Sequence, residues 1–220
     1  MKQKFKQNDE KNINAWAMYD WANSAYALVI TSAIFPIYYN DITKNDNGDM
    51  VSFFDYEIVN SALFSYAISI GFLIVAFISP LLSSIADYTG NKKLFMRLFC
   101  YLGSFACMSM YFFDSAATVE VGIIALILAS VGYSGSIVFY NAYLPIIATK
   151  DRHDKISAKG FSLGYIGSVL LLLLCLAMVL KPSMFGIANG GMAARISFVI
   201  VGLWWLSLIH ISEPTRHRRI

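Results

Sequence analysis

Six long apolar segments divide this sequence, and each is long enough to cross a lipid bilayer as a helix. A spanning helix needs about 20 mostly apolar residues, because the hydrocarbon core is about 30 Å thick. Only 14% of the 220 residues are charged, whereas soluble domains have roughly 25%. We therefore predict an all-α membrane protein with six transmembrane helices. The expected spans are residues 15–39, 59–84, 94–113, 119–143, 160–180 and 193–209.

Basic residues alternate between the connections that join these spans. Eleven of them lie before the first span, between the second and third, and between the fourth and fifth, whereas three lie in the other connections up to the sixth span. Loops on the cytoplasmic side of a membrane carry the excess of Lys and Arg. We therefore expect the polar N-terminal tail, residues 1–14, to lie in the cytoplasm, with the bundle covering residues 15–206.

The first span contains polar residues that are costly to place in a membrane. Asp20, Asn23 and Thr31 fall along one face of a helix. An ionisable residue inside a spanning segment usually faces the bundle interior or a watery cavity. These residues are candidates for gating, for substrate binding or for proton coupling. The alternative is that Asp20 lies at the inner interface and is simply hydrated.

The fourth span ends in the sequence FYNAYLP, residues 139–145, which contains Asn141. Asn141 would lie near the cytoplasmic end, at a depth similar to that of Asp20. It is therefore a second candidate for the gating or substrate site. A hydrogen bond that only holds two helices together is an equally good explanation, because amide side chains often bridge helices in lipid.

The connection after the second span is short and charged, and it contains Asp87, Gly90 and Lys92. Gly90 permits a sharp backbone turn, and Asp87 could accept hydrogen bonds from the N-terminus of the next helix. The simpler interpretation is an ordinary cytoplasmic turn with positive-inside lysines.

Small residues recur at four-residue spacing on the fifth span, at Gly160, Gly164 and Ser168. Such a face allows close helix packing in lipid, where the hydrophobic effect does not drive association. We interpret these residues as a packing face, and a ligand-binding role as the weaker alternative.

Other classes of function find little support in the sequence. The three histidines, His153, His210 and His217, are not spaced as metal ligands, and the sequence has no phosphate-binding loop or nucleophile elbow. The three cysteines lie within apolar runs and suggest neither a disulfide framework nor a zinc site. We expect no enzymatic activity, no metal, no cofactor and no nucleic-acid partner.

Three stretches resemble one family of transporters, the UMF1 branch of the major facilitator superfamily, which includes Atg22-like vacuolar effluxers. They are AWAMYDWANSAYALVITSAIFPIYY at 15–39, FYNAYLPIIA at 139–148 and ISAKGFSLGYIGSVLLLL at 156–173. The turn with Asp87, Gly90 and Lys92 is similar to the superfamily's signature between its second and third helices. That signature turn is thought to help hold one face shut, so the resemblance gives Asp87 a conformational role.

The resemblance implies the N-terminal half of a twelve-helix fold, built from two inverted three-helix repeats. Transport of a small solute would then occur by alternating access between two halves. It further implies export of amino acids as an activity, a C-terminal six-helix half as the partner, and the lipid bilayer as the surroundings. The membrane would be the cell membrane in a bacterium or the vacuolar membrane in a fungus.

Two further expectations concern the end of the chain and the competing function. Residues 207–220 include SLIHISEPTR, which resembles a translated sequencing adapter, so we expect a non-native tail there. A genuine basic cytoplasmic tail is the alternative. The competing function is a non-transporting membrane scaffold or receptor-like bundle.

Overall fold

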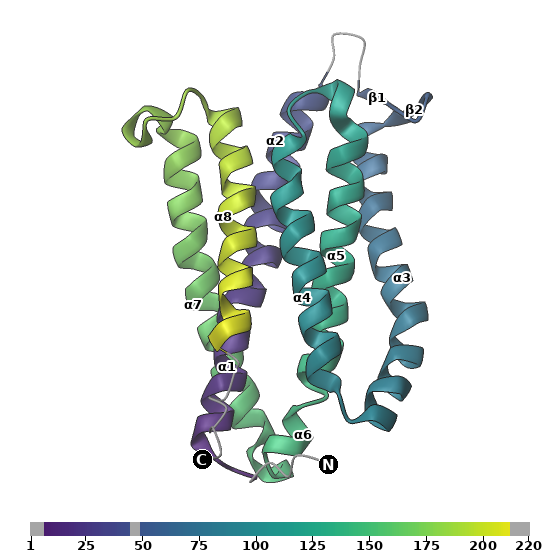
Figure 1. Cartoon of the computed structure of the whole chain (residues 1–220). Coiled ribbons are helices and arrows are strands. Elements are labelled where there is room, and N and C mark those ends of the chain that lie inside the picture. Colours follow the sequence, from purple (N-terminus) through teal and green to yellow (C-terminus); the bar gives the residue numbers. More distant parts are fainter. Residues whose placement is uncertain (1–6, 45–48, 212–220) are drawn as a thin grey trace, which may run out of the picture.

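Helices that run along a common axis make up nearly all of the described chain (Figure 1). The computed structural model describes residues 7–44 and 49–211. The long helices are α1 (Glu10–Ala25), α3 (Asn60–Thr89), α4 (Lys92–Ser109), α5 (Val119–Asn141), α7 (His153–Leu180) and α8 (Gly190–Ile211). The shorter elements are η1 (Tyr26–Ile34), α2 (Phe35–Thr43), η2 (Met110–Phe112), η3 (Ala116–Thr118), α6 (Leu144–Ile147), η4 (Lys150–Arg152) and η5 (Pro182–Phe185). Two strands, β1 (Met50–Phe53) and β2 (Tyr56–Val59), complete the set.

Five helical stretches within the described residues are long and apolar enough to cross a membrane. They are Asn60–Tyr88, Lys92–Phe112, Ala116–Ile147, Lys150–Leu180 and Gly190–Ser207. They coincide with the second to sixth predicted spans, and the chain is an all-α membrane protein. The first predicted span, residues 15–39, is not among the five, so the count of six stays a prediction.

The first predicted span is a succession of three helical segments, α1, η1 and α2, that continue one another. The middle segment, η1, is a π-helix, and Phe35 N–H donates to the carbonyl of Ile30, five residues back. Pro36 follows directly. A proline ring clashes with the carbonyl four residues before it and lacks a donor. The wider π-turn relieves that clash, which explains why the regular helix changes here.

The helix boundaries differ from the prediction mainly at α7. This helix begins at His153, seven residues before the predicted start at Gly160. Lys155 and Lys159, which we assigned to the preceding loop, lie in its first turns. At the other end of the chain, α8 continues to Ile211. Residues 207–211 of the expected tail are thus helical, and residues 212–220 lie outside the described part of the chain.

The connection between α2 and α3 contains a β-hairpin that the sequence did not predict. β1 and β2 pair antiparallel, with Phe53 opposite Tyr56. The two turn residues between them, Phe54 and Asp55, both have positive φ angles, 50° and 66°. Positive φ at both positions is typical of the type I′ turn that suits a two-residue hairpin. The Phe54 N–H donates to Glu120 Oε1 of α5 at 3.3 Å, which ties the hairpin to the bundle.

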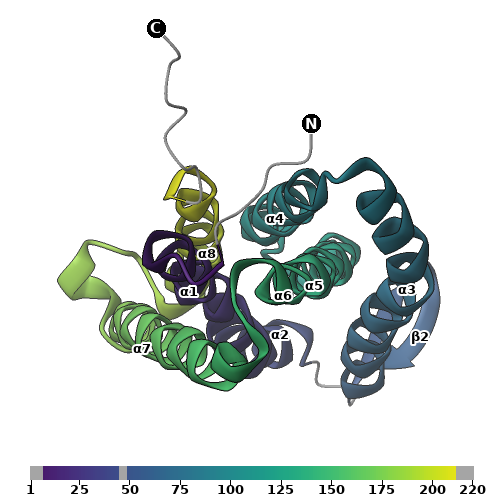
Figure 2. The same cartoon turned by 90° about the horizontal axis from the view of Figure 1, so that it is seen from below.

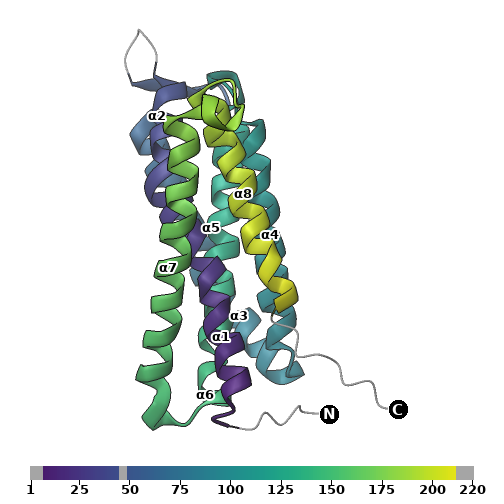
Figure 3. The same ribbon diagram turned by 90° about the vertical axis from the view of Figure 1, so that its left-hand side faces the viewer.

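Two groups of helices build the bundle, as the view along its axis shows (Figure 2). In one group α5 packs against α3 and α4, and in the other α1 packs against α7 and α8. Contacts between α4 and α8 join the groups, and these two helices run side by side (Figure 3). Glycines permit the closest approach, because a Cβ on Gly132 of α5 would lie 2.5 Å from the Cα of Gly103 on α4.

The two ends of the bundle differ, and they are named here by the elements they carry. The hairpin end holds β1, β2, α2 and the turn between α4 and α5, and the α6 end holds α6, the start of α1 and the turn between α3 and α4 (Figure 1). Aromatic rings fill the hairpin end around Phe35, which packs against Phe113 and Phe198 with ring centroids 6.1 and 5.8 Å away. This cluster anchors the first helical path against α4 and α8.

Candidate functional site

The polar face of the first helical path is buried between α5 and α7. Asp20 is only 7% exposed and Asn23 only 1% exposed. Asp20 lies ten residues into α1, which is about three helical turns. Burial at this depth differs from hydration at the end of a helix, which was the alternative interpretation of Asp20.

The carboxyl group of Asp20 has one hydrogen bond. Ser24 Oγ donates to Asp20 Oδ1 at 2.9 Å. The second oxygen, Oδ2, is buried and has no hydrogen-bond partner in the described structure. Within the described residues no ion pair involves Asp20. A buried carboxylate with one oxygen unpaired and no ion-pair partner is costly, and binding of a proton or a ligand would lower that cost.

Two hydrogen bonds join the same face of the first path to α5. Ser136 Oγ donates to Asn23 Oδ1 at 3.1 Å. One turn further along, the Tyr26 hydroxyl and Ser130 Oγ lie 2.9 Å apart. Both contacts are buried, and they set the axial position of α5 relative to Asp20.

A second polar atom without a partner lies close to this face. Tyr140 of α5 is 5% exposed, and its hydroxyl has no hydrogen-bond partner among the described residues. Its ring stacks on Trp16 at 4.2 Å and on Tyr19 at 5.0 Å between centroids. Trp16 Nε1 also donates to the Tyr140 carbonyl at 3.0 Å. Tyr140 was not among the predicted site residues, although its spacing from Ser136 places both on one helical face.

The small residues of α7 cover the carboxyl group from the other side. A Cβ on Gly164 would lie 2.7 Å from Ser24 Oγ and 3.1 Å from Asp20 Oδ2. A Cβ on Gly160 would lie 2.9 Å from the Tyr140 hydroxyl. Ser168 is buried, and its hydroxyl donates to the Gly164 carbonyl at 2.6 Å. The backbone of α7 therefore lies directly over both polar groups.

Thr31 and Asn141 do not join this cluster. Thr31 lies in η1, about three turns along the path from Asp20, and it is half-buried. Asn141 is the last residue of α5 and its side chain is exposed. Its neighbour Tyr140 is the buried residue at this end of α5.

The turn between α3 and α4 lies at the α6 end. Gly90 has a φ of 69°, in the left-handed region, and caps α3. Lys92 Nζ and Asp87 Oδ1 form an ion pair at 2.7 Å across this turn. Asp87 thus pairs with a side chain at the start of α4, where we had considered backbone N–H groups as its partners.

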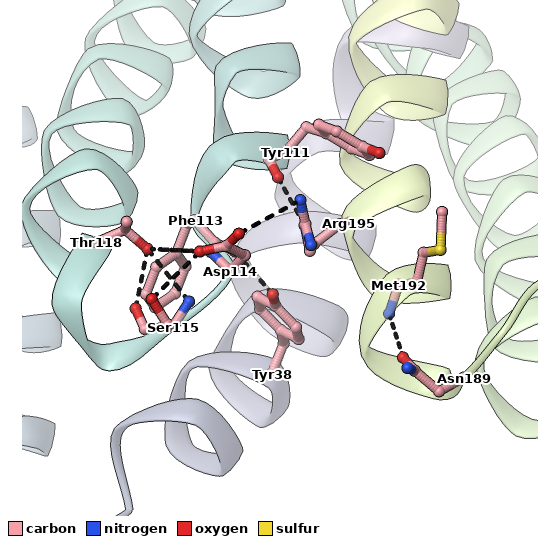
Figure 4. A network of polar contacts seen from close by, with 9 residues as sticks. All are labelled: Tyr38, Tyr111, Phe113, Asp114, Ser115, Thr118, Asn189, Met192 and Arg195. Atoms are coloured by element: carbon pink, nitrogen blue, oxygen red, sulfur yellow. Dashed lines mark hydrogen bonds and ion pairs between the residues drawn. The ribbon is translucent and has the colours of Figure 1, made fainter.

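A polar network closes the hairpin end and joins three helical paths (Figure 4). Arg195 of α8 donates through Nε to the Tyr111 carbonyl at 2.7 Å and lies over the Tyr111 ring. The Tyr38 hydroxyl donates to the Phe113 carbonyl at 2.7 Å. These donors satisfy the carbonyls of Tyr111 in η2 and of Phe113 just after it. Both lie beyond the C-terminal end of α4, where the helix dipole favours a cation such as Arg195.

The same network begins the next helix. Ser115 and Thr118 form a capping box at the start of η3, which leads into α5. Asp114 accepts a hydrogen bond from Ser115 Oγ at 3.2 Å, and its other oxygen lies 4.0 Å from Arg195. The turn between α4 and α5 is therefore tied to both α2 and α8.

Contacts at the α6 end tie the start of α1 to the segment before α7. Asn8 Nδ2 donates to Thr149 Oγ1 at 3.0 Å, and Arg152 pairs with Glu10 at 2.9 Å. The hydrogen bond from Arg152 lowers the pKa of Glu10. We call these contacts the α6-end clasp.

Comparison with known proteins gives a family and several relatives. A family model described as "Vacuole effluxer Atg22 like" matches residues 8–216. The chain is 33% identical over 196 residues to the "Uncharacterized MFS-type transporter YxiO" of Bacillus subtilis, covering 89% of this chain and 44% of that protein. It is 21% identical over 276 residues to autophagy-related protein 22 of Pyricularia oryzae, with 89% and 40% covered. The chain thus spans less than half the length of these relatives. No solved structure matches.

Proposed function

Because this chain belongs to the Atg22-like vacuole effluxer family, we propose that it forms one half of a membrane transporter for a small solute. The second half is a further six-helix bundle, and transport takes place by alternating access between the two. The proposal is supported by the relatives, since one is an MFS-type transporter and the chain covers 44% of its length.

The packing of the helices supports a pair of inverted repeats within this half. Such repeats would relate the first helical path to α5, α3 to α7, and α4 to α8. The contact between α1 and α7 then corresponds to the contact between α5 and α3, and both occur. Exchanging the two repeats swaps α4 with α8, so the contact between these two helices maps onto itself, and this contact is present.

The observation that carries the proposal is the buried carboxyl group of Asp20, with one oxygen unpaired. A group of this kind is expensive at membrane depth and is usually kept for function, as in proton relays and substrate pathways. We assign it to coupling or gating, together with Asn23 on the same face.

We place the α6 end in the cytoplasm, and amino acids are the first solutes to test. The excess of basic residues in the connections at this end supports the orientation. The family description supports efflux, and the amino-acid class follows from the family resemblance alone.

Counterflow in liposomes tests the transport proposal. Vesicles loaded with one amino acid at a time receive either this chain alone or the chain joined to a second half from a full-length relative. The joined protein should accumulate radiolabelled solute, and its Asp20→Asn variant should not. The chain alone should give no counterflow. Counterflow by the joined protein that is independent of Asp20 contradicts the assignment of the site. No counterflow with any solute favours a membrane scaffold.

A further inference from the structure

Two buried oxygen atoms without hydrogen-bond partners border the same stretch of α7. They are Asp20 Oδ2 of α1 and the Tyr140 hydroxyl of α5. Both side chains are more than nine-tenths buried, with exposed fractions of 7% and 5%. Their neighbours on α7, Gly164 and Gly160, are one helical turn apart on one face. Three helices thus bring two unsatisfied polar groups to one place.

We propose that Asp20 and Tyr140 form one proton-binding site, which the glycine face of α7 seals. The inference rests on the proposed function and names its coupling ion. The Asp20 carboxylate takes the proton from a hydronium ion: the Oδ2–H bond forms as one O–H bond of the hydronium breaks, and a water molecule is released. Asp20 and the Tyr140 hydroxyl make no hydrogen bond in this structure. When the proton leaves, the Tyr140 hydroxyl moves to donate a hydrogen bond to the carboxylate.

The chemistry of the surroundings favours a proton over a metal cation. A sodium or larger metal ion needs several oxygen ligands, and the helix carbonyls here are used by the backbone. The described residues contain no group of three His, Cys, Asp or Glu side chains that could hold a metal ion. One carboxyl group and neutral hydroxyls are enough for a proton.

The groups that face Asp20 leave its charge uncompensated. From α5, the titratable side chains that interact with Asp20 are Tyr133 and Tyr140. From α7, Gly164 lies against Asp20, and Lys159, the basic residue of α7 nearest to Gly164 in sequence, donates to Asn14. From α8, Trp204 donates through Nε1 to the Trp21 carbonyl, one residue beyond Asp20. Proton binding is therefore the means by which this site becomes neutral.

The seal follows from how closely α7 approaches. A methyl group on Gly164 would lie 2.7 Å from Ser24 Oγ and 3.1 Å from Asp20 Oδ2, so at least the Ser24 side chain would have to shift. Ser168 bonds back to the Gly164 carbonyl, a contact that often bends a helix. Proton exchange then requires α7 to separate from α1, which couples protonation to the position of α7.

Carbodiimide labelling tests the site without any solute or second half. Dicyclohexylcarbodiimide reacts with protonated carboxyl groups in apolar surroundings, and mass spectrometry locates the adduct. The 220-residue chain is placed in lipid nanodiscs and labelled over a pH series, in sodium chloride and in choline chloride. Asp20 should be labelled with a single pH midpoint that is the same in both salts.

The variants separate the proposed site from general packing. Tyr140→Phe keeps the stacked ring and loses the donor to the anion, so the labelling midpoint should move up by about one pH unit, a tenfold change in the protonation equilibrium. Tyr165→Phe, on the 70% exposed Tyr165 of α7, should keep the wild-type midpoint. Gly164→Ala should label several-fold faster than wild type, and Gly191→Ala, which has room for a methyl group, should not.

Each of the following results would contradict one part of the proposal. An unchanged midpoint in Tyr140→Phe shows that Tyr140 is no part of the site. Protection of Asp20 by sodium shows a metal-ion site. Equal labelling rates for Gly164→Ala and wild type show that the close approach of α7 does not limit access to Asp20. A failure here leaves the counterflow result untouched, so the two proposals fail separately.

Discussion

Replacing Gly132 with alanine is expected to force α4 and α5 apart. The new Cβ would lie 2.5 Å from the Cα and N of Gly103 and 2.7 Å from the Phe99 carbonyl oxygen. These are backbone atoms, so no side-chain rotation relieves the clash. Ordinary contact begins near 3.4 Å, and the helices must therefore separate locally by about 0.9 Å. A gap of that size forfeits a quarter to a half of the dispersion energy across the contact.

The magnitude follows from this separation. Overpacking typically costs about 1–3 kcal/mol, and the better helix propensity of alanine offsets up to about 1 kcal/mol. A net loss of about 1–2 kcal/mol lowers Tm by about 2–8 °C for a chain of this size. Gly191→Ala is the matched control, because its nearest neighbour would lie at 3.4 Å.

A thiol-reactive dye provides the assay in detergent micelles. Cys100, Cys107 and Cys175 are all buried and free, so the dye reacts as the chain unfolds. Gly132→Ala should unfold at a lower temperature than wild type, and Gly191→Ala at the same or a slightly higher temperature. A Tm for Gly132→Ala at or above the wild-type value refutes the close backbone packing.

Two further predictions concern the ends of the bundle. In the α6-end clasp, Arg152 holds the pKa of Glu10 below its ordinary value of 4.5. The ionised form therefore stabilises the fold above that pH, and the stabilisation is lost as pH falls through the lowered pKa. The Tm difference between wild type and Glu10→Gln should accordingly shrink below pH 4.5; a difference that grows on acidification contradicts the pairing. At the hairpin end, Arg195→Lys removes the Nε donor to Tyr111 and should cost about 1–2 kcal/mol in unfolding free energy. Thermal unfolding checks this, with Lys181→Met on the exposed Lys181 as control, and equal losses in both variants contradict the network.

The apolar runs predicted most of the fold, because length and hydropathy decide where a chain can cross a bilayer. The start of α7 was predicted too late in the sequence, because the basic residues before Gly160 were assigned to a loop. Lys155 and Lys159 suggest a loop, yet long basic side chains near a helix end can extend to the membrane surface. The π-segment η1 depends on how Pro36 is accommodated in three dimensions, and periodicity does not encode that.

The β-hairpin shows another limit of sequence patterns. Phe54 and Asp55 occupy turn positions that usually carry glycine or asparagine. The turn is held by a contact with Glu120, which is far away in sequence. Local propensity alone could not have found it.

The sequence pointed to candidate residues on the first helical path, and the structure places residues of α5 and α7 beside them. The cost of burying Asp20 and Asn23 drew attention to this face in the sequence, and both side chains are buried in the structure. The structure adds the buried Tyr140, next to Asn141, whose side chain is exposed. A shift of one residue turns a side chain by about 100° around a helix. The FYNAYLP stretch therefore indicated the right part of α5 but not which of its side chains is buried.

Solute-driven proton movement shows whether Asp20 couples solute transport to protons. Liposomes that contain the joined two-half protein and a trapped pH dye receive the solute that shows counterflow. We expect the solute to change the internal pH, Asp20→Asn to abolish the change, and Tyr140→Phe to shift its pH dependence. Solute transport with no proton movement, at the same rate in wild type and Asp20→Asn, would contradict the account.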